Sequence, residues 1–380
     1  MRILFTGGGT GGHIFPIIAV ARQLKKNYRE SVEPIGPSKE TSLEMFFLGS
    51  NGFAKKLLEK EEIKVKTILT GKFRRYFSIY NILDLFKAPL GLLQSFWHLF
   101  VLMPDIVFSK GGYGSVPVVL VSWIYRIPIL IHESDILPGL ANRLSAKLSR
   151  KIAVSFAKTK EYFPDKKTTL IGNPIRSEII QVCLLHNEEN KEKAKNIFKI
   201  ISHKPVIFIL GGSQGSEKIN KLVLDSLPKL LERYEIIHQC GIKNYNNILQ
   251  KISQLPVNYH VFPFLNEEQM SFAYYLSDLI VSRAGAGSIS EIAACAKPSI
   301  LIPLPKSASG HQRKNAFNYA KSGTTIVLEQ LNLTPNLFLN EINKILDDSE
   351  LVQKMSDNAK EFSRPEAAQR IAQEIIEMGR

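Results

Sequence analysis

Short apolar runs recur along the chain, and each leads through a turn into a segment with apolar residues at helical spacing. The runs show no alternation of polar and apolar positions, so both faces of each predicted strand should be buried. Buried strands that alternate with helices are typical of a parallel sheet covered by helices on both faces. The clearest runs lie at 2–6, 105–109, 127–133, 206–210 and 278–282.

The pattern of strand and helix occurs twice. A first series ends near the turn IGNPIR at 171–176, a charged segment that favours helix follows, and a new apolar strand opens at Val206. We therefore predict an α/β protein with two doubly wound, Rossmann-like domains in tandem, covering 1–173 and 174–364. The last segment, 365–380, predicts a terminal helix with a proline near its first turn, and the pattern alone assigns it to neither domain.

The composition is that of a globular protein with a basic excess. Of 380 residues, 44% are hydrophobic and 22% are charged, which excludes an intrinsically disordered chain. The formal net charge of +14 favours an acidic partner, which could be a phosphorylated substrate, an anionic bilayer or a nucleic acid. The basic residues are scattered and form no runs interleaved with aromatic residues, so we expect no nucleic acid partner.

Three cysteines, Cys183, Cys240 and Cys295, lie far apart and lack the spacing of a zinc site. We expect neither a zinc site nor a disulfide framework, and this cysteine content fits a reducing cytoplasm. The first residues lead directly into an apolar strand and do not resemble a secretory signal peptide. We therefore expect the chain to stay in the cytosol.

The segment 72–105 is unlike the rest of the chain, because it holds no Asp, Glu, Lys or Arg from Ala88 to Met103. It is shorter than the roughly 20 apolar residues that a spanning helix needs, and Pro89, Gly91 and Gln94 interrupt it. Part of it should pack on the sheet. Basic residues beside aromatic ones also favour contact with an anionic leaflet. These are Lys72, Arg74, Arg75 and Lys87, beside Phe73, Tyr76 and Phe77.

The loop GGGTGGHIFP follows the first predicted strand and could hold one of several nucleotide classes. Gly7, Gly9 and Gly12 match the dinucleotide pattern G-x-G-x-x-G, but no acidic residue ends the second predicted strand to hold a ribose. A P-loop is excluded because His13 stands where that motif needs a lysine. We therefore expect an anion on the backbone N–H groups at the helix start, and not NAD.

His13 follows these glycines directly and has two interpretations. Its imidazole either caps or packs at the helix start, or it accepts a proton from a bound substrate. The second role is available because an ordinary histidine, with a pKa of about 6.5, is largely uncharged at neutral pH. The glycines, which admit a ligand to the backbone, favour this second role.

Two loops in the second half combine glycines with polar side chains. GGSQG at 211–215 adds Ser213 and Gln214 as donors for a phosphate or a sugar. In RAGAGSISE, Ser288 and Glu291 have the spacing of a capping box, but Glu291 is equally suited to accept hydrogen bonds from two ribose hydroxyls. No Asp-x-Asp occurs, so helix N-termini and Arg176 would have to stabilise a leaving diphosphate.

The chain resembles the MurG family of bacterial N-acetylglucosaminyltransferases, which belongs to glycosyltransferase family 28. The resemblance rests on seven motifs in this order: GGTGGHIFP, GGYGSVP, HESDILPGLANR, IGNPIR, GGSQGSEKIN, SRAGAGSISEIAACAKPSILIPLP and GHQRKNA. It implies a GT-B fold, in which two Rossmann-like domains face a central cleft and the helix at 365–380 packs back on the first. It also implies an inverting transfer of GlcNAc from UDP-GlcNAc to the C4 hydroxyl of MurNAc in lipid I, which gives lipid II.

The same resemblance implies where the protein works and with what. The first domain would face the acceptor and the membrane, and the second would bind UDP-GlcNAc. The protein would lie peripherally on the cytoplasmic face of the bacterial plasma membrane, with anionic inner-leaflet lipids and other peptidoglycan-synthesis enzymes as partners. No cofactor would be required, no residue would bind a metal, and a divalent cation would be at most stimulatory.

Motif matching also assigns site residues. His13 would be the catalytic base, Glu291 would hold the ribose, Gln312 would lie near the GlcNAc hydroxyls and Leu265 beside the uracil. Asp135 departs from the family, many of whose members have Asn there, and its charge should weaken binding of a sugar diphosphate unless it faces sugar hydroxyls. The other substrate-binding residues would be Thr10, Gly11, Gly12, Arg176, Ser213, Gln214, Ala286, Gly287 and Ser288, with Gly9, Gly112 and Tyr113 in acceptor-side loops.

Three other functions remain as alternatives. The nearest is another GT-B glycosyltransferase with a lipid acceptor such as diacylglycerol, although GGYGSVP and HES favour lipid I. A nicotinamide-dependent oxidoreductase is disfavoured by the missing ribose-binding acid. A nucleic-acid binder without enzymatic activity would use the net charge but leave the glycine loops unexplained.

Overall fold

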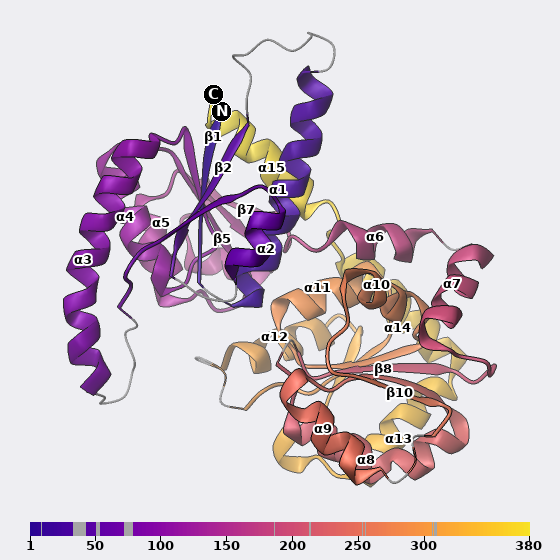
Figure 1. Cartoon of the computed structure of the whole chain (residues 1–380). Helices are drawn as coiled ribbons and strands as arrows, with labels where there is room; N and C mark the ends of the chain where they lie inside the picture. The colour runs from indigo at the N-terminus through magenta and orange to yellow at the C-terminus, as the bar shows by residue number, and fades with distance from the viewer. Residues whose placement is uncertain are drawn as a thin grey trace. The chain divides into compact units, whose positions relative to one another are not determined.

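The computed structural model describes residues 1–8, 10–32, 43–50, 54–71, 79–185, 187–212, 214–252, 254, 256–305, 307 and 310–380. The chain divides into two compact units, one formed by Met1–Ile175 with Pro365–Arg380 and the other by Arg176–Arg364. Each unit contains one sheet flanked by helices (Figure 1). The described strand pairs in both sheets are parallel, which confirms the predicted fold class.

The sheet of the first unit has seven strands in the order β3-β2-β1-β4-β5-β6-β7. The chain moves outward from β1 in one direction and then in the other, so the topological switch point lies between β1 and β4. Ligands of open α/β sheets bind outside the carboxyl ends of the strands at such a point. The strands are β1 (Arg2–Thr6), β2 (Glu44–Gly49), β3 (Lys64–Thr67), β4 (Ile106–Ser109), β5 (Ile129–Glu133), β6 (Lys151–Val154) and β7 (Thr168–Leu170).

Helices cover both faces of this sheet, because alternate strand residues point to opposite sides. Ile3 and Phe5 pack under α1 (Gly11–Val32), α2 (Ala54–Lys60) and α15 (Ala367–Met378). Leu4 packs under α3 (Ile79–Leu102), α4 (Val116–Ile124) and α5 (Leu140–Leu148). The terminal helix α15 lies beside α1 and is tied to β6 by an ion pair between Lys151 and Glu374.

The segment that holds α3 divides into a buried and an exposed face. Gly91, Ser95 and Leu99 are buried, and a side chain at Gly91 would clash with the carbonyl of Leu69. Gln94 accepts a hydrogen bond from the Leu69 N–H at 2.7 Å. Part of this segment therefore packs on the unit, as predicted. The predicted contact residues from Lys72 to Phe77 lie outside the described residues. Among the helices described, none has the length and apolar composition to cross a membrane.

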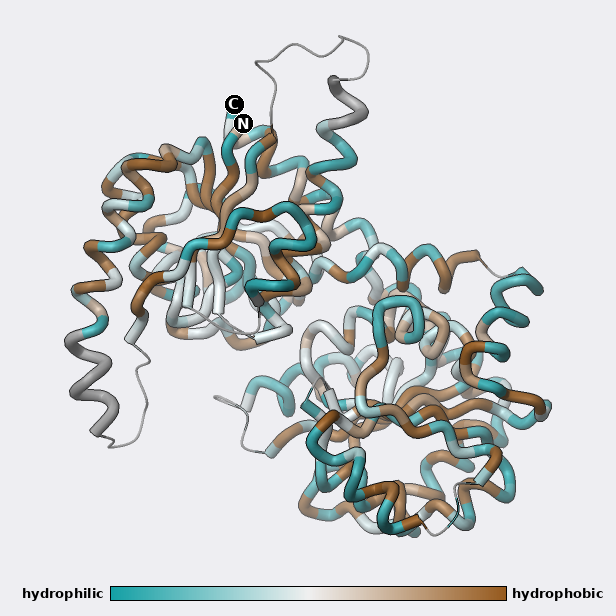
Figure 2. Tube along the Cα trace, in the orientation of Figure 1, coloured by the Kyte–Doolittle hydropathy of each residue, from teal (hydrophilic) through white to brown (hydrophobic). Residues whose placement is uncertain are grey.

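The sheet of the second unit has six strands in the order β10-β9-β8-β11-β12-β13, with its switch point between β8 and β11. Figure 2 shows hydrophobic stretches in the strands of each unit. The strands are β8 (Val206–Leu210), β9 (Glu235–Gln239), β10 (Tyr259–Phe262), β11 (Leu279–Ser282), β12 (Ser299–Leu301) and β13 (Thr325–Val327).

Helices also cover both faces of the second sheet. One face carries α6 (Ser177–Leu184), α7 (Glu188–Phe198), α10 (Glu267–Leu276), α11 (Ala286–Ala294) and α12 (His311–Ala320). The other carries α8 (Glu217–Arg233), α9 (Ile242–Lys251) and α13 (Pro335–Leu346). Helix α14 (Ser349–Phe362) contributes Met355 to one core cluster and packs Phe362 against the other.

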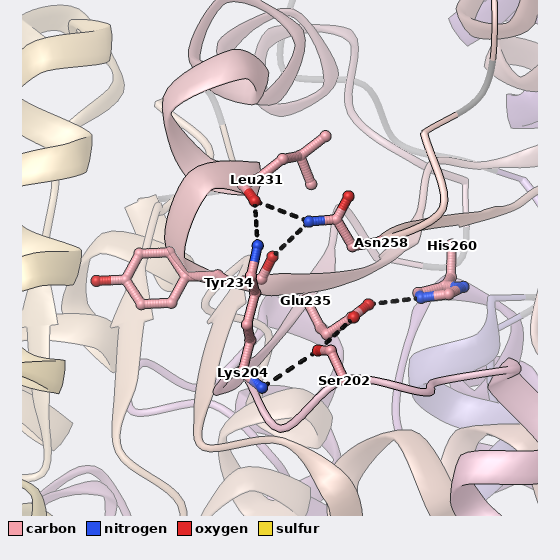
Figure 3. Close-up of polar contacts among 7 residues, drawn as sticks. All are labelled: Ser202, Lys204, Leu231, Tyr234, Glu235, Asn258 and His260. Atoms are coloured by element: carbon pink, nitrogen blue, oxygen red, sulfur yellow. Dashed lines mark hydrogen bonds and ion pairs between the residues drawn. The ribbon is translucent and has the colours of Figure 1, made fainter.

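A polar cluster fixes the starts of β9 and β10, at the end of the sheet away from the switch point (Figure 3). The buried carboxylate of Glu235 accepts a hydrogen bond from Ser202 Oγ at 2.6 Å and contacts His260 Nε2 at 2.8 Å. Asn258 donates to the Leu231 carbonyl at 2.8 Å. The carboxylate lies between the serine and the histidine, so these contacts do not pair the serine hydroxyl with the imidazole as in a catalytic triad. We therefore interpret the cluster as structural.

The structure corrects the expectation about the cysteines. Cys183 in α6 and Cys295, which follows α11, form a disulfide with their Cα atoms 5.1 Å apart. Their positions are 112 residues apart in sequence, and only the packing of α6 against α11 brings them together. Cys240 is a buried free thiol.

Candidate functional site

Each unit carries a candidate half-site at the switch point of its own sheet. In the first unit, the loop after β1 meets the loop after β4, and the Gly8 N–H donates to the Gly111 carbonyl at 2.9 Å. Gly112 has φ +87°, and a Cβ there would lie 3.0 Å from Gly8 Cα. The two glycine loops can therefore touch only because this position has no side chain.

His13 lies in the first turn of α1, beside these loops. Its Nδ1 is 2.7 Å from Thr10 Oγ1, and its Nε2 lies 3.4 Å from where a Cβ on Gly112 would be. Burial and the charge of Lys110 lower the pKa of His13 to about 4, although Asp135 acts in the opposite direction. The imidazole is therefore uncharged at neutral pH and able to accept a proton.

A buried lysine, which the sequence analysis missed, lies at the end of β4. The Lys110 ammonium contacts His132 Nδ1 and Ser134 Oγ, and it donates to Asn173 Oδ1 at 3.1 Å. His132 Nε2 is 2.8 Å from the Gly172 carbonyl, so Nε2 carries the proton and Nδ1 is left to accept. Burial and Lys110 hold the pKa of His132 well below its usual range.

Two acidic residues lie at the end of β5: Glu133 is its last residue, and Asp135 follows it. The buried Glu133 accepts hydrogen bonds from Asn142 Nδ2 at 2.9 Å, from the Gly139 N–H at 3.0 Å and from the Asp135 N–H at 3.0 Å. Burial and the charge of Asp135 raise the pKa of Glu133. Asp135 is partly exposed. Its charge, which we expected to weaken the binding of a sugar diphosphate, interacts with the buried Lys110 and raises the pKa of that lysine.

The other predicted residues of this unit surround His13. Thr10 and Gly11 lie at the start of α1, and the space beside Gly12 is open, since a Cβ there would have no neighbour within 4 Å. Tyr113 begins a short helical turn after Gly112 and is exposed. Gly9 lies outside the described residues.

In the second unit, the turn after β8 packs tightly on the end of β9. Gly215 has φ +77°, and a Cβ there would clash with the Cys240 carbonyl. Arg283, from the end of β11, donates to Ser216 Oγ at 2.6 Å and to the Ile302 carbonyl at 2.9 Å. Gln214 is exposed in this turn, and Ser213 lies outside the described residues.

The two helices that follow the glycine turns differ at their N-termini. The Ser216 side chain accepts a hydrogen bond from the Ile219 N–H and caps α8, and Glu217 places a negative charge in its first turn. The N-terminus of α8 therefore already has an acceptor and a negative charge. Helix α11 begins after Gly285, with no acidic residue in its first turn and no capping side chain from the described residues. The capping-box interpretation of Ser288 and Glu291 is wrong, because the helix begins before Ser288. A helix N-terminus without a side-chain cap favours an anion.

Glu291 instead pairs with Arg176. The guanidinium donates to Glu291 Oε1 from Nε at 3.0 Å and from Nη2 at 2.8 Å, and Tyr274 Oη donates to Oε2 at 3.0 Å. Burial holds the pKa of Tyr274 well above its usual range, so it stays a donor. The structure thus brings two predicted donor-contact residues together. Ala286, Gly287 and Ser288 form the first turn of the same helix, α11.

Leu265 and Gln312 hold the remaining loops of this half-site. The Leu265 side chain is fully buried, and its N–H donates to Gln239 Oε1 at 3.0 Å. Leu265 itself therefore offers no exposed surface to a ligand. Gln312, at the start of α12, accepts a hydrogen bond from the Leu304 N–H at 3.0 Å. Among the described residues, no group of three or more His, Cys, Asp or Glu side chains is arranged to hold a metal ion.

Comparison with known families decides the relationship. The glycosyltransferase family 28 N-terminal domain matches residues 3–154, and the C-terminal domain of the same family matches residues 206–371. This chain belongs to glycosyltransferase family 28. The two matches cover most of both units and include His13, Lys110 and Glu291.

Relatives in family 28 extend over almost the whole chain. The UDP-N-acetylglucosamine--N-acetylmuramyl-(pentapeptide) pyrophosphoryl-undecaprenol N-acetylglucosamine transferase 2 of Bacillus thuringiensis subsp. konkukian is 35% identical over 378 residues, covering 99% of each chain. The transferase of the same name from Clostridium novyi, which carries no number, is 38% identical over 352 residues and covers 92% of this chain and 91% of its own. The crystal structure of Acinetobacter baumannii MurG is 25% identical, with a TM-score of 0.73 and 99% of each chain covered.

Proposed function

We propose that this family 28 glycosyltransferase transfers GlcNAc from UDP-GlcNAc to the C4 hydroxyl of MurNAc in lipid I, giving lipid II with inversion at the sugar. The names of the relatives supply the substrates. The observation that carries the proposal is an uncharged histidine, His13, at a helix N-terminus between two touching glycine loops. We assign the acceptor to the first unit and the donor to the second.

His13 would act as the general base. If its Nδ1–H donates to Thr10 Oγ1, then Nε2, on the side of Gly112, is free to take the proton of the C4 hydroxyl. That hydroxyl oxygen forms a bond to C1 of GlcNAc as the bond from C1 to the UDP oxygen breaks. The electron pair of the broken bond leaves with UDP. Thr10 therefore fixes the tautomer on which the base depends.

The departing UDP would be stabilised in the second unit. The start of α11 offers uncapped N–H groups, whereas α8 is already capped by Ser216. Glu291 would accept the ribose hydroxyls, Gln312 would contact the GlcNAc, and the loop that contains Leu265 would lie beside the uracil. We propose no required cofactor, with a divalent cation at most stimulatory.

Release of UDP from UDP-GlcNAc tests this function. We expect release to depend on a soluble lipid I analogue, to fail with diacylglycerol as acceptor, and to persist in EDTA. Release without any acceptor, or with diacylglycerol in place of the lipid I analogue, would overturn the assignment. A full loss of activity in EDTA would instead contradict only the proposal that no metal is required.

We further propose that the first unit rests on an anionic inner leaflet through α3 and α4. One face of α3 carries exposed apolar side chains at helical spacing: Leu90, Leu93, Trp97, Phe100 and Val101. Trp123 and Ile124 on α4 are exposed as well. The two helices pack together. Three exposed cations lie close by: Lys87 is in α3, Arg126 follows α4, and Lys66 interacts with His98 of α3. An apolar stripe with adjacent cations suits a protein that lies on a bilayer without crossing it.

Vesicle binding tests this surface. The double variant Trp97→Ser/Phe100→Ser should lose most of its binding to phosphatidylglycerol vesicles, because both side chains are more than half exposed, at 66% and 60%. Leu331→Ser in the second unit is the control, since Leu331 is still more exposed, at 86%. Equal binding by wild type and the double variant would remove the membrane proposal and leave the transferase proposal untouched.

A further inference from the structure

We propose that Lys110 is a positioning residue of the acceptor half-site: a fixed ammonium beside the two glycine loops that opposes protonation of the His13 imidazole, with Asp135 acting in the opposite direction. The proposal rests on the proposed function only in giving His13 the role of base. Lys110 does not touch the reacting atoms in this account. It acts through the field that it imposes on His13.

The surroundings of Lys110 fit a charged ammonium. An ammonium has three protons and no lone pair, and Lys110 faces three acceptors: His132 Nδ1, Ser134 Oγ and Asn173 Oδ1. Each acceptor is set by a second bond. His132 donates from Nε2 to a backbone carbonyl, and Ser134 Oγ donates to Asn173 at 3.0 Å. The three contacts hold the charge in one place.

Gly7 lies beside both the lysine and the histidine. A Cβ built on Gly7 would lie 3.4 Å from Lys110 Cβ and 3.6 Å from His13 Cβ. Both side chains are shielded from water to a large extent, Lys110 almost completely. Charges in a site shielded from water are screened less than in bulk solvent, so the charge of Lys110 opposes protonation of His13.

The charged groups around the pair set the sign of the effect. Lys110 and Asp135 act on His13 in opposite directions, and Glu133 and Asp135 act on Lys110. His132 stays neutral, because its pKa is lowered well below 6.5. Burial lowers the pKa of Lys110 to about 7, which is above the value of about 4 for His13. Lys110 therefore carries its charge over the whole range in which His13 takes up a proton.

The experiment is an NMR titration of the His13 imidazole in the full-length protein, without substrate. The chain has eight histidines, so His13→Gln identifies the signal. In Lys110→Met we expect the pKa of His13 to rise by about one unit, because a nearby cation is lost. In Asp135→Asn, which leaves the three acceptors of Lys110 in place, we expect it to fall. Lys147→Met, at an exposed position in the same unit, is the control and should leave it unchanged.

The acidic limb of kcat/KM for transfer should move with the titration, upward in Lys110→Met and downward in Asp135→Asn. An unchanged His13 titration in Lys110→Met overturns the proposal. If that variant does not fold, an unchanged titration in Asp135→Asn overturns it instead, and a fall supports it. Absence of acceptor-dependent UDP release in the wild type would reject the proposed function. The titration requires no substrate, so it would still test the effect of Lys110 on His13.

Discussion

The ion pair between Arg176 and Glu291 gives the strongest stability prediction. The guanidinium makes two hydrogen bonds to one carboxylate oxygen, and the two side chains are only 10% and 12% exposed. Arg176→Met keeps much of the side-chain length but removes the charge and both donors. The Glu291 carboxylate then keeps its hydrogen bond from Tyr274 but loses its cation.

Breaking a buried ion pair from one side costs about 3–5 kcal/mol, because an unpaired charge is left in the interior. The remaining exposure lets water reach the carboxylate, so we expect the lower end, about 3 kcal/mol, for Arg176→Met. Replacing Glu291 by Gln in the same chain removes that charge. The double variant should therefore recover about 1–2 kcal/mol relative to Arg176→Met, which is the coupling expected of residues in direct contact.

Urea denaturation, monitored by circular dichroism, measures the stability of both variants. The midpoint of the transition of the second unit should fall in Arg176→Met and rise again in the double variant. Arg233→Met is the control, because its partner Asp347 and Arg233 itself are about half exposed, at 50% and 48%, and its midpoint should match the wild type. Should Arg176→Met match this control, or should the double variant be less stable than Arg176→Met, the reasoning about the buried charge is refuted.

Three further predictions follow from the described contacts. His13→Gln should lower kcat by about 10²–10⁴-fold with little change in the KM for UDP-GlcNAc. Since the base must be uncharged, wild-type kcat/KM should fall only as the pH drops through about 4, and a fall near pH 6.5 would contradict this. Gly215→Ala should raise the KM for UDP-GlcNAc, because its Cβ would clash with the Cys240 carbonyl at a positive φ; unchanged donor kinetics would contradict it. Glu235→Gln should lower the free energy of unfolding by about 1–3 kcal/mol, as judged by thermal melting, because a buried acceptor of two hydrogen bonds is altered; an unaltered melting temperature would argue against the structural role of that cluster.

The fold could be predicted because its determinants are local in sequence. A strand such as β8, with five buried residues in succession, can only be covered on both faces. The glycine loops could be located for the same reason, since each directly follows such a strand. His13 was found because it adjoins one of these loops.

The contacts made by the site residues could not be predicted, because they join distant segments. The three acceptors of Lys110 come from the end of β5 and from the turn that contains Asn173. The pairing of Arg176 with Glu291 and the Cys183–Cys295 disulfide both depend on α6 packing against α11. A lysine at the end of a buried strand was the available signal for Lys110, but it has no meaning until its neighbours are known.

The helices of the second unit differ in whether a side chain caps their N-terminus. Side chains cap α7, α8, α10, α13 and α14, through Asn187, Ser216, Asn266, Thr334 and Asp348. The helix that carries Glu291, α11, instead begins after Gly285 without a side-chain cap from the described residues, whereas at the start of α12 the Gln312 N–H donates to Ser307 Oγ at 3.2 Å. Uncapped N–H groups reduce the stability of a helix unless another acceptor binds them. A diphosphate is such an acceptor, so the ligand itself would complete α11, and a side-chain cap in place of Gly285 would compete with it.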